Sequence, residues 1–125
     1  MKLILIATLL FAPSFFAYSA DLGETAPAFS LESIPGSEPV ELESQTEKIL
    51  YIDFWASWCG PCRIEHPILL RLNEEKNLHL LGVNFKDKKN NALNFLKDLG
   101  DPYDDLARDE LGKHSINFGI YGIPE

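Results

Sequence analysis

The stretch from Ile49 to Pro67, which reads ILYIDFWASWCGPCRIEHP, constrains the fold more than any other part of this chain. It begins as an apolar run rich in β-branched and aromatic residues, breaks at a short turn, and continues past two cysteines into a helical pattern. The pattern predicts a buried strand over residues 49–54. That strand delivers Cys59 and Cys62 to the first turn of a helix.

This placement favours redox chemistry of the two thiols. The positive end of a helix dipole stabilises a thiolate, which is the form that attacks disulfides. We therefore expect Cys59 to be an acidic, exposed nucleophile, and Cys62, one helical turn later, to resolve the mixed disulfide. Gly60 allows a substrate to approach the backbone. Pro61 sets the φ angle of the first helical turn and lacks an N–H that would otherwise be unpaired.

Cys59 and Cys62 have three alternative roles besides a redox pair: a metal site, haem attachment and a structural disulfide. A metal site needs further ligands at suitable spacing, and the three histidines of the chain are scattered. Haem attachment needs a histidine directly after the second cysteine, where this chain has Arg63. A structural disulfide, the third alternative, forms in exported proteins because their compartment is oxidising. We favour the redox pair and predict no metal and no cofactor.

The rest of the chain predicts an α/β domain with a parallel pair of strands. Apolar residues on both faces of the strand at 49–54 predict a central strand that helices cover on both sides. A strand, a crossover helix and a second strand form a βαβ unit. Pro67 interrupts the first helix, and Gly100 ends the second. The predicted strands are 27–31, 40–42, 49–54, 78–85 and 104–107, and the predicted helical segments are 60–76, 92–99 and 111–115.

Several separated segments resemble one known family. The residues around the two cysteines are similar to the active-site segment of thioredoxin. The chain from Gly23 onward resembles the periplasmic thioredoxin-like proteins of cytochrome c maturation, the DsbE/CcmG family. The segments that carry this resemblance are GETAPAFSL from Gly23, CRIEH from Cys62, GVNFKD from Gly82 and GIYGIPE from Gly119.

The resemblance implies a thioredoxin-like fold with a mixed sheet flanked by helices. In that family, a strand pair and a last helix follow the Gly-x-Pro-Glu motif. We expect this chain, which ends at Glu125, to lack them. The strand at 49–54 would then be an exposed edge, which invites aggregation. We therefore expect the chain to be marginally stable or unfolded alone, which a cooperative thermal transition would contradict.

The resemblance also implies roles for residues around the thiols. Asp53 is the charged residue in an apolar strand, and it is either an ordinary strand-end carboxylate or a buried proton shuttle for Cys62. We favour the shuttle. Glu65 is either a surface carboxylate or part of an acidic patch that raises cysteine pKa values and attracts basic substrates.

Three further positions are expected to contact substrate. Trp58 would provide an apolar docking surface beside Cys59, while Ile123 and Pro124 match the proline loop that lies opposite the thiols in the resembled family. The isomer of Pro124 is left open. The lysine-rich run over residues 86–89 is expected to be a solvated turn.

Charge and the N-terminus restrict the setting. Eleven Lys and Arg against nineteen Asp and Glu give a net charge of −8, which argues against nucleic acid as a partner. Residues 1–19 combine Lys2, an apolar core and small residues before a possible cleavage point after Ser19. They are either a signal peptide or a membrane anchor, and residues 20–125 form the domain. Both alternatives predict that the domain is exported, and the resemblance implies that it lies in the periplasm, free or bound to the inner membrane.

The resemblance implies a function in cytochrome c maturation. The chain would be a thiol:disulfide oxidoreductase that reduces the C-x-x-C-H disulfide of apocytochrome c and receives electrons from a membrane thiol reductase. Asp53 and the Gly60-Pro61 spacer are more typical of general thioredoxins. One alternative is therefore a general periplasmic reductase. The other alternative is a truncated fragment without function.

Overall fold

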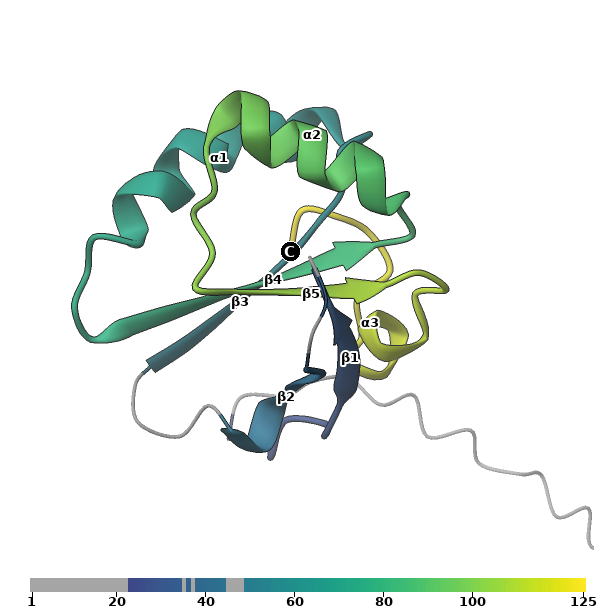
Figure 1. Cartoon of the computed structure of the whole chain (residues 1–125). Helices are drawn as coiled ribbons and strands as arrows, with labels where there is room; N and C mark the ends of the chain where they lie inside the picture. The colour runs from purple at the N-terminus through teal and green to yellow at the C-terminus, as the bar shows by residue number, and fades with distance from the viewer. Residues whose placement is uncertain (1–22, 35, 37, 45–48) are drawn as a thin grey trace, which may run out of the picture.

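The computed structural model describes residues 23–34, 36, 38–44 and 49–125, without the side chain of residue 44. Within them, five strands form one sheet in the order β2-β1-β5-β4-β3 (Figure 1). The predicted mixed sheet is confirmed. The elements are β1 (Ser30–Ser33), β2 (Val40–Glu41), the 3-10 turn η1 (Leu42–Ser44), β3 (Ile49–Trp55), α1 (Gly60–Leu72), β4 (Leu78–Phe85), α2 (Lys89–Leu99), β5 (Asp105–Asp109) and α3 (Lys113–Asn117).

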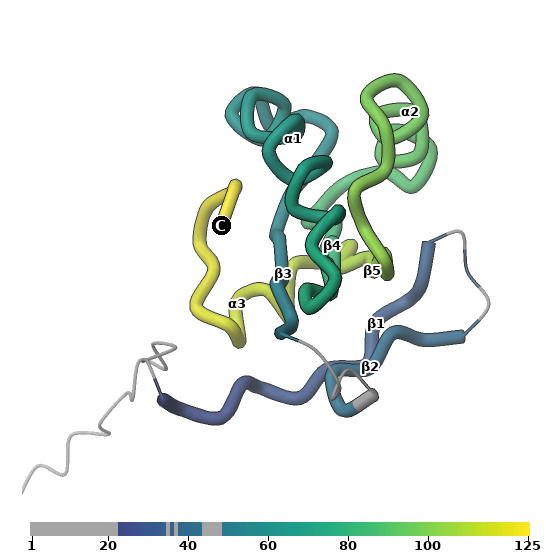
Figure 2. The backbone as a smooth tube through the Cα atoms, turned by 90° about the vertical axis from the view of Figure 1, so that its left-hand side faces the viewer, coloured from purple at the N-terminus to yellow at the C-terminus, as the bar shows by residue number. Residues whose placement is uncertain are grey.

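The parallel half of the sheet is made of β3, β4 and β5. Asp53 lies opposite Gly82 in β4, and Gly82 lies opposite Leu106 in β5. The connections between these strands are α1 and α2, so the predicted βαβ unit is confirmed and is followed by a second one. Both helices lie on the same face of the sheet (Figure 2). The short strands β1 and β2 are antiparallel and extend the sheet beyond β5.

Each face of the sheet has its own apolar cluster. The cluster under α1 and α2 contains Trp55, Leu80, Phe95, Tyr103 and both cysteines. The cluster on the opposite face is formed by residues such as Phe54, Leu81 and Val83, against which Phe118 packs after α3. Successive residues of β3 and β4 thus enter different clusters, as the alternation of side chains along a strand requires. The cysteines belong to the core on the helical face.

Two predictions about β3 and α1 need correction. The first half of β3 is not covered on both faces, because Ile49 is 71% and Tyr51 40% exposed. Among the described strands, β3 lies at the edge of the sheet, and Ile49 and Tyr51 share the face of Trp55, so α1 and α2 leave the first half of that face uncovered. On the opposite face, Leu50 and Ile52 pack against the second cluster. The first helix ends at Leu72 rather than at residue 76. Asn73 caps it, and the side chain of Asn73 donates a hydrogen bond to the carbonyl of Pro102.

The other boundaries differ by a few residues. Helix α2 begins three residues before the predicted start, and β5 and α3 begin one and two residues later than predicted. The predicted leader at residues 1–19 and positions 35 and 37 of the β1–β2 turn lie outside the described residues. In the part of the chain that the structure describes, no helix has the length and apolar content needed to cross a membrane.

Candidate redox site

The structure places both cysteines where β3 gives way to α1. Cys59 is the N-cap residue of α1 and forms a disulfide with Cys62, and Gly60 and Pro61 begin the helix between them. The backbone N–H of Cys62 donates to the Cys59 Sγ at 3.2 Å. This N–H is one of the groups that an α-helix leaves unpaired at its N-terminus. The same donor would stabilise negative charge on Cys59 when the disulfide is reduced.

The expected exposure of Cys59 is wrong for the disulfide form. Both Cys59 and Cys62 are only 4% exposed. Both cysteines, joined by the disulfide, belong to the apolar cluster of the helical face, against which Ile123 packs. The neighbouring Trp58 is 59% exposed instead. In this state the exposed apolar surface beside the disulfide is therefore the indole.

Asp53 is a buried carboxylate in the same region. It is 2% exposed, and the hydroxyl of Tyr103 donates to its Oδ2 at 2.5 Å. Burial raises the pKa of Asp53 from its ordinary value of 3.8 to about 6, the Tyr103 hydrogen bond lowers that pKa, and the negative charge of Glu65 raises it. A carboxyl with a pKa near neutrality can accept and return a proton at physiological pH.

The sequence reasoning missed Tyr103. Burial and the adjacent Asp53 carboxylate raise the pKa of its hydroxyl, so the hydroxyl stays protonated and donates. The Tyr103 ring lies over β4, where a Cβ on Gly82 would come within 2.7 Å of it. A glycine in the middle of an apolar strand often marks such a close approach. Gly82 was therefore the available signal, although it did not specify which residue would fill the space.

Glu65 lies on α1, one turn after Cys62, and is partly buried. Burial raises the pKa of its carboxyl. Its charge raises the pKa values of Asp53 and of Tyr51 on β3. The structure therefore brings Glu65 and Asp53 into the same electrostatic environment, although they come from different elements.

The turn before Cys59 is held by the loop between β4 and α2. Asp87 accepts hydrogen bonds from the backbone and the hydroxyl of Ser57, and the indole of Trp58 donates to the carbonyl of Lys86 at 3.2 Å. Asp87 is 7% exposed. The interpretation of the lysine-rich run as a simple solvated turn is therefore wrong at this position. Asp87 lies among lysines in the sequence, so the sequence alone did not indicate that its carboxylate is buried.

The segment that contains Ile123 and Pro124 runs beside β3 (Figure 2). The Ile123–Pro124 peptide bond is cis. Phe54 and Glu125 exchange backbone hydrogen bonds, with Phe54 donating at 2.9 Å and Glu125 at 3.4 Å. Ile123 packs against the clusters of both faces. The structure thus brings this segment to the edge of β3, next to the cluster that holds the cysteines.

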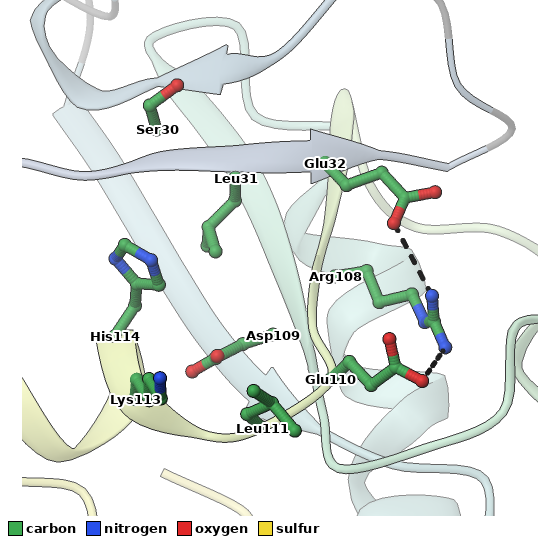
Figure 3. A pocket seen from close by; sticks show the side chains of 9 residues that line it. All are labelled: Ser30, Leu31, Glu32, Arg108, Asp109, Glu110, Leu111, Lys113 and His114. Atoms are coloured by element: carbon green, nitrogen blue, oxygen red, sulfur yellow. Dashed lines mark hydrogen bonds and ion pairs between the residues drawn. The ribbon is translucent and has the colours of Figure 1, made fainter.

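A pocket of about 280 Å³ has neither cysteine in its lining, and Figure 3 shows the residues that surround it. Its walls come from β1, β5 and α3, and none of the predicted site residues lines it. Arg108 is engaged there by Glu32 and Glu110 at 3.4 and 2.9 Å. Among the described residues, no group of three or more His, Cys, Asp or Glu side chains is arranged to hold a metal ion.

Comparison with known proteins identifies the family of this chain. The family model described as Redoxin matches residues 21–123. The chain belongs to the redoxin family. A Chlorobium tepidum structure described as thiol:disulfide interchange protein DsbE is 34% identical to this redoxin, with a TM-score of 0.73, over 85% of this chain and 75% of that one.

Two curated relatives of this redoxin are also named thiol:disulfide interchange proteins. It is 39% identical to the thiol:disulfide interchange protein HelX of Rhodobacter capsulatus, over 82% of this chain and 58% of HelX. It is 46% identical to the thiol:disulfide interchange protein CycY of Rhizobium leguminosarum, over 62% of this chain and 42% of CycY. The chain thus spans about half the length of these relatives.

Proposed function

We propose that this redoxin is the catalytic part of an exported thiol:disulfide oxidoreductase that reduces disulfides in partner proteins. The observation that supports this most directly is the Cys59–Cys62 disulfide at the start of α1, with the Cys62 N–H donating to the Cys59 Sγ. A dithiol at a helix N-terminus has the lowered nucleophile pKa that exchange requires. The names of HelX and CycY agree with this activity.

The reaction begins with the reduced dithiol. The Cys59 thiolate attacks one sulfur of the partner's disulfide, so a Cys59–partner disulfide forms and the partner's own S–S bond breaks. The other partner sulfur leaves as a thiolate and takes up a proton. The exposed Trp58 beside Cys59, together with Ile123 and Pro124, forms the surface on which the partner rests.

Cys62 completes the reaction from within α1. Its thiol gives up a proton to Asp53, whose pKa of about 6 suits that transfer. The resulting thiolate attacks the Cys59 sulfur, and the Cys59–partner bond breaks. The partner's second sulfur leaves as a thiolate and takes up the proton held by Asp53, so the partner is released as a dithiol. Two electrons and two protons have then passed from the Cys59–Cys62 dithiol to the partner, and the disulfide seen in the structure remains.

The direction and setting are part of the proposal. The Gly60-Pro61 spacer is that of reducing thioredoxins, for which the potential is roughly −270 mV. The favoured substrate is the C-x-x-C-H disulfide of apocytochrome c, with a membrane thiol reductase as electron donor. Residues 1–19 would act as a signal peptide or an anchor, and the domain at 20–125 would work in the periplasm.

The test follows the sulfur atoms directly. The reduced native protein is mixed with a disulfide peptide, quenched by alkylation and analysed by mass. We expect one Cys59–Cys62 disulfide per peptide reduced, a trapped mixed disulfide on Cys59 in Cys62→Ser, and no adduct in Cys59→Ser. If neither sulfur of the wild-type protein changes its oxidation state, the proposal is wrong.

A second comparison separates the two substrate hypotheses. An oxidised C-x-x-C-H peptide and insulin are offered under identical conditions. Faster reduction of the haem-attachment peptide supports the role in cytochrome c maturation. Equal rates support a general reductase, which the thioredoxin-like Asp53 and Gly60-Pro61 also favour.

A further inference from the structure

The turn that leads into Cys59 is bound by a single carboxylate from another part of the chain. The Asp87 Oδ2 accepts from the backbone N–H of Ser57 at 2.7 Å, and its Oδ1 accepts from the Ser57 hydroxyl at 3.0 Å. Ser57 precedes Cys59 by two residues, whereas Asp87 belongs to the loop between β4 and α2. This contact therefore joins the nucleophile's own turn to a loop thirty residues away in sequence.

The hydrogen bonds require a carboxylate at this position. Oδ1 also accepts from the Lys88 backbone N–H at 2.7 Å, and Oδ2 also accepts from the Asn84 side-chain amide at 3.2 Å. Each oxygen of Asp87 thus faces a backbone N–H. An asparagine has one acceptor oxygen and an NH₂ group, so one of the two backbone donors would face another donor. Asparagine has nearly the same size as aspartate, so the hydrogen-bond donors around position 87, and not the available space, select the carboxylate.

The residue before Asp87 fixes the other side of the same turn. Lys86 has φ +46°, a conformation uncommon for residues other than glycine, and its carbonyl accepts from the Trp58 indole at 3.2 Å. Trp58 is 59% exposed, yet this bond restrains its ring. Adjacent loop residues therefore hold Ser57 and Trp58 together, immediately before the nucleophile.

We propose that Asp87 is a positioning residue for the attack on the partner's disulfide. Through Ser57 it holds the turn so that Trp58 and Cys59 face the partner together. The proposal rests on the proposed oxidoreductase function. It assigns Asp87 to formation of the mixed disulfide and not to its resolution. Resolution depends on Cys62 and Asp53, while the hydrogen bonds of Asp87 go to Ser57, Asn84 and Lys88.

The test compares Asp87→Asn with Asp98→Asn in the native protein. Asp98 is exposed on α2, so its replacement removes the same charge at a position away from the turn. We expect Asp87→Asn to slow mixed-disulfide formation about ten-fold, because small misplacements of reacting groups are costly. Asp98→Asn should match wild type. Resolution of the preformed mixed disulfide should proceed at the wild-type rate in both variants.

Nuclear magnetic resonance gives a readout that does not depend on activity. The two tryptophans provide an internal comparison, because Trp55 is buried and Trp58 is exposed. In Asp87→Asn, the Trp58 indole ¹H–¹⁵N group should become mobile while that of Trp55 stays rigid. If Asp87→Asn does not fold, Asp87→Glu replaces it. The carboxylate is then kept but displaced, so Trp58 should again be mobilised and attack slowed.

Three results would overturn the assignment. They are an unchanged attack rate in the folded Asp87 variant, an equal loss in attack and resolution, and an indole of Trp58 as rigid as in wild type. Failure of the proposed function is distinguishable from these, because the wild-type protein would then reduce no disulfide at all. In that case the indole measurement alone would decide whether Asp87 holds the turn.

Discussion

Replacing Asp53 by asparagine isolates the cost of burying one carboxyl group. The amide oxygen can still accept the hydrogen bond that the Tyr103 hydroxyl now donates to Asp53. The group at position 53 no longer titrates. Because Asp53 is 2% exposed and its pKa is raised from 3.8 to about 6, the folded wild-type protein holds its proton more tightly than the unfolded chain.

The sign of the pH effect follows from this difference. Below about pH 4, Asp53 is protonated in both states, and its contribution to stability is fully present. Between about pH 4 and 6, the unfolded chain loses the proton first, so stability falls as the pH rises. Above the folded pKa the loss is complete. The interval from 3.8 to about 6 corresponds to about 3 kcal/mol in the free energy of unfolding.

The assay is urea unfolding of the disulfide form of the native protein from pH 3.5 to 8, in wild type and in Asp53→Asn. Neither cysteine titrates in that form. We expect the free energy of unfolding of wild type, relative to the variant, to fall by about 3 kcal/mol over this range. A difference independent of pH, or one that grows in favour of wild type as the pH rises, would refute the reasoning.

The remaining predictions concern Asp53 and the residues around it. The rate at which a trapped mixed disulfide is resolved should depend on the ionisation of Asp53 and show an inflection near pH 6. Asp53→Asn should slow this step and abolish the inflection, as measured by rapid quenching with an alkylating reagent at each pH. Tyr103→Phe should move that inflection upward, because the lost hydrogen bond lowered the pKa of Asp53, and no movement would exclude the contact. Glu65→Gln should move it downward, since the charge of Glu65 raises the same pKa, and an upward movement would contradict this. Gly82→Ala should destabilise the fold by about 1 to 3 kcal/mol through overpacking against the Tyr103 ring, as measured by urea unfolding, and an unchanged midpoint would show that the ring moves aside freely.

Much of the fold could be predicted because its signals are local. The apolar run before the cysteines predicted β3, and residues 78–85 were predicted as β4 with the same bounds. The Cys59-Gly60-Pro61-Cys62 motif predicted the junction with α1, since proline and the thiols are informative at a helix N-terminus. The end of α1 was not predictable in the same way. The helix ends at Asn73, whose side chain donates to the carbonyl of Pro102, a partner that lies far along the chain.

Local sequence patterns specify a dithiol at the start of a helix, directly after an apolar strand that contains one acidic residue. Patterns of that kind depend on neighbours within a few positions. Three features emerge only when the chain folds: Asp53 pairs with Tyr103, Asp87 is buried against Ser57, and Cys59 is covered in the disulfide form. The physical reason is that burial and hydrogen bonding set the pKa and the orientation of a side chain. Both depend on residues that come together only when the sheet and its helices assemble.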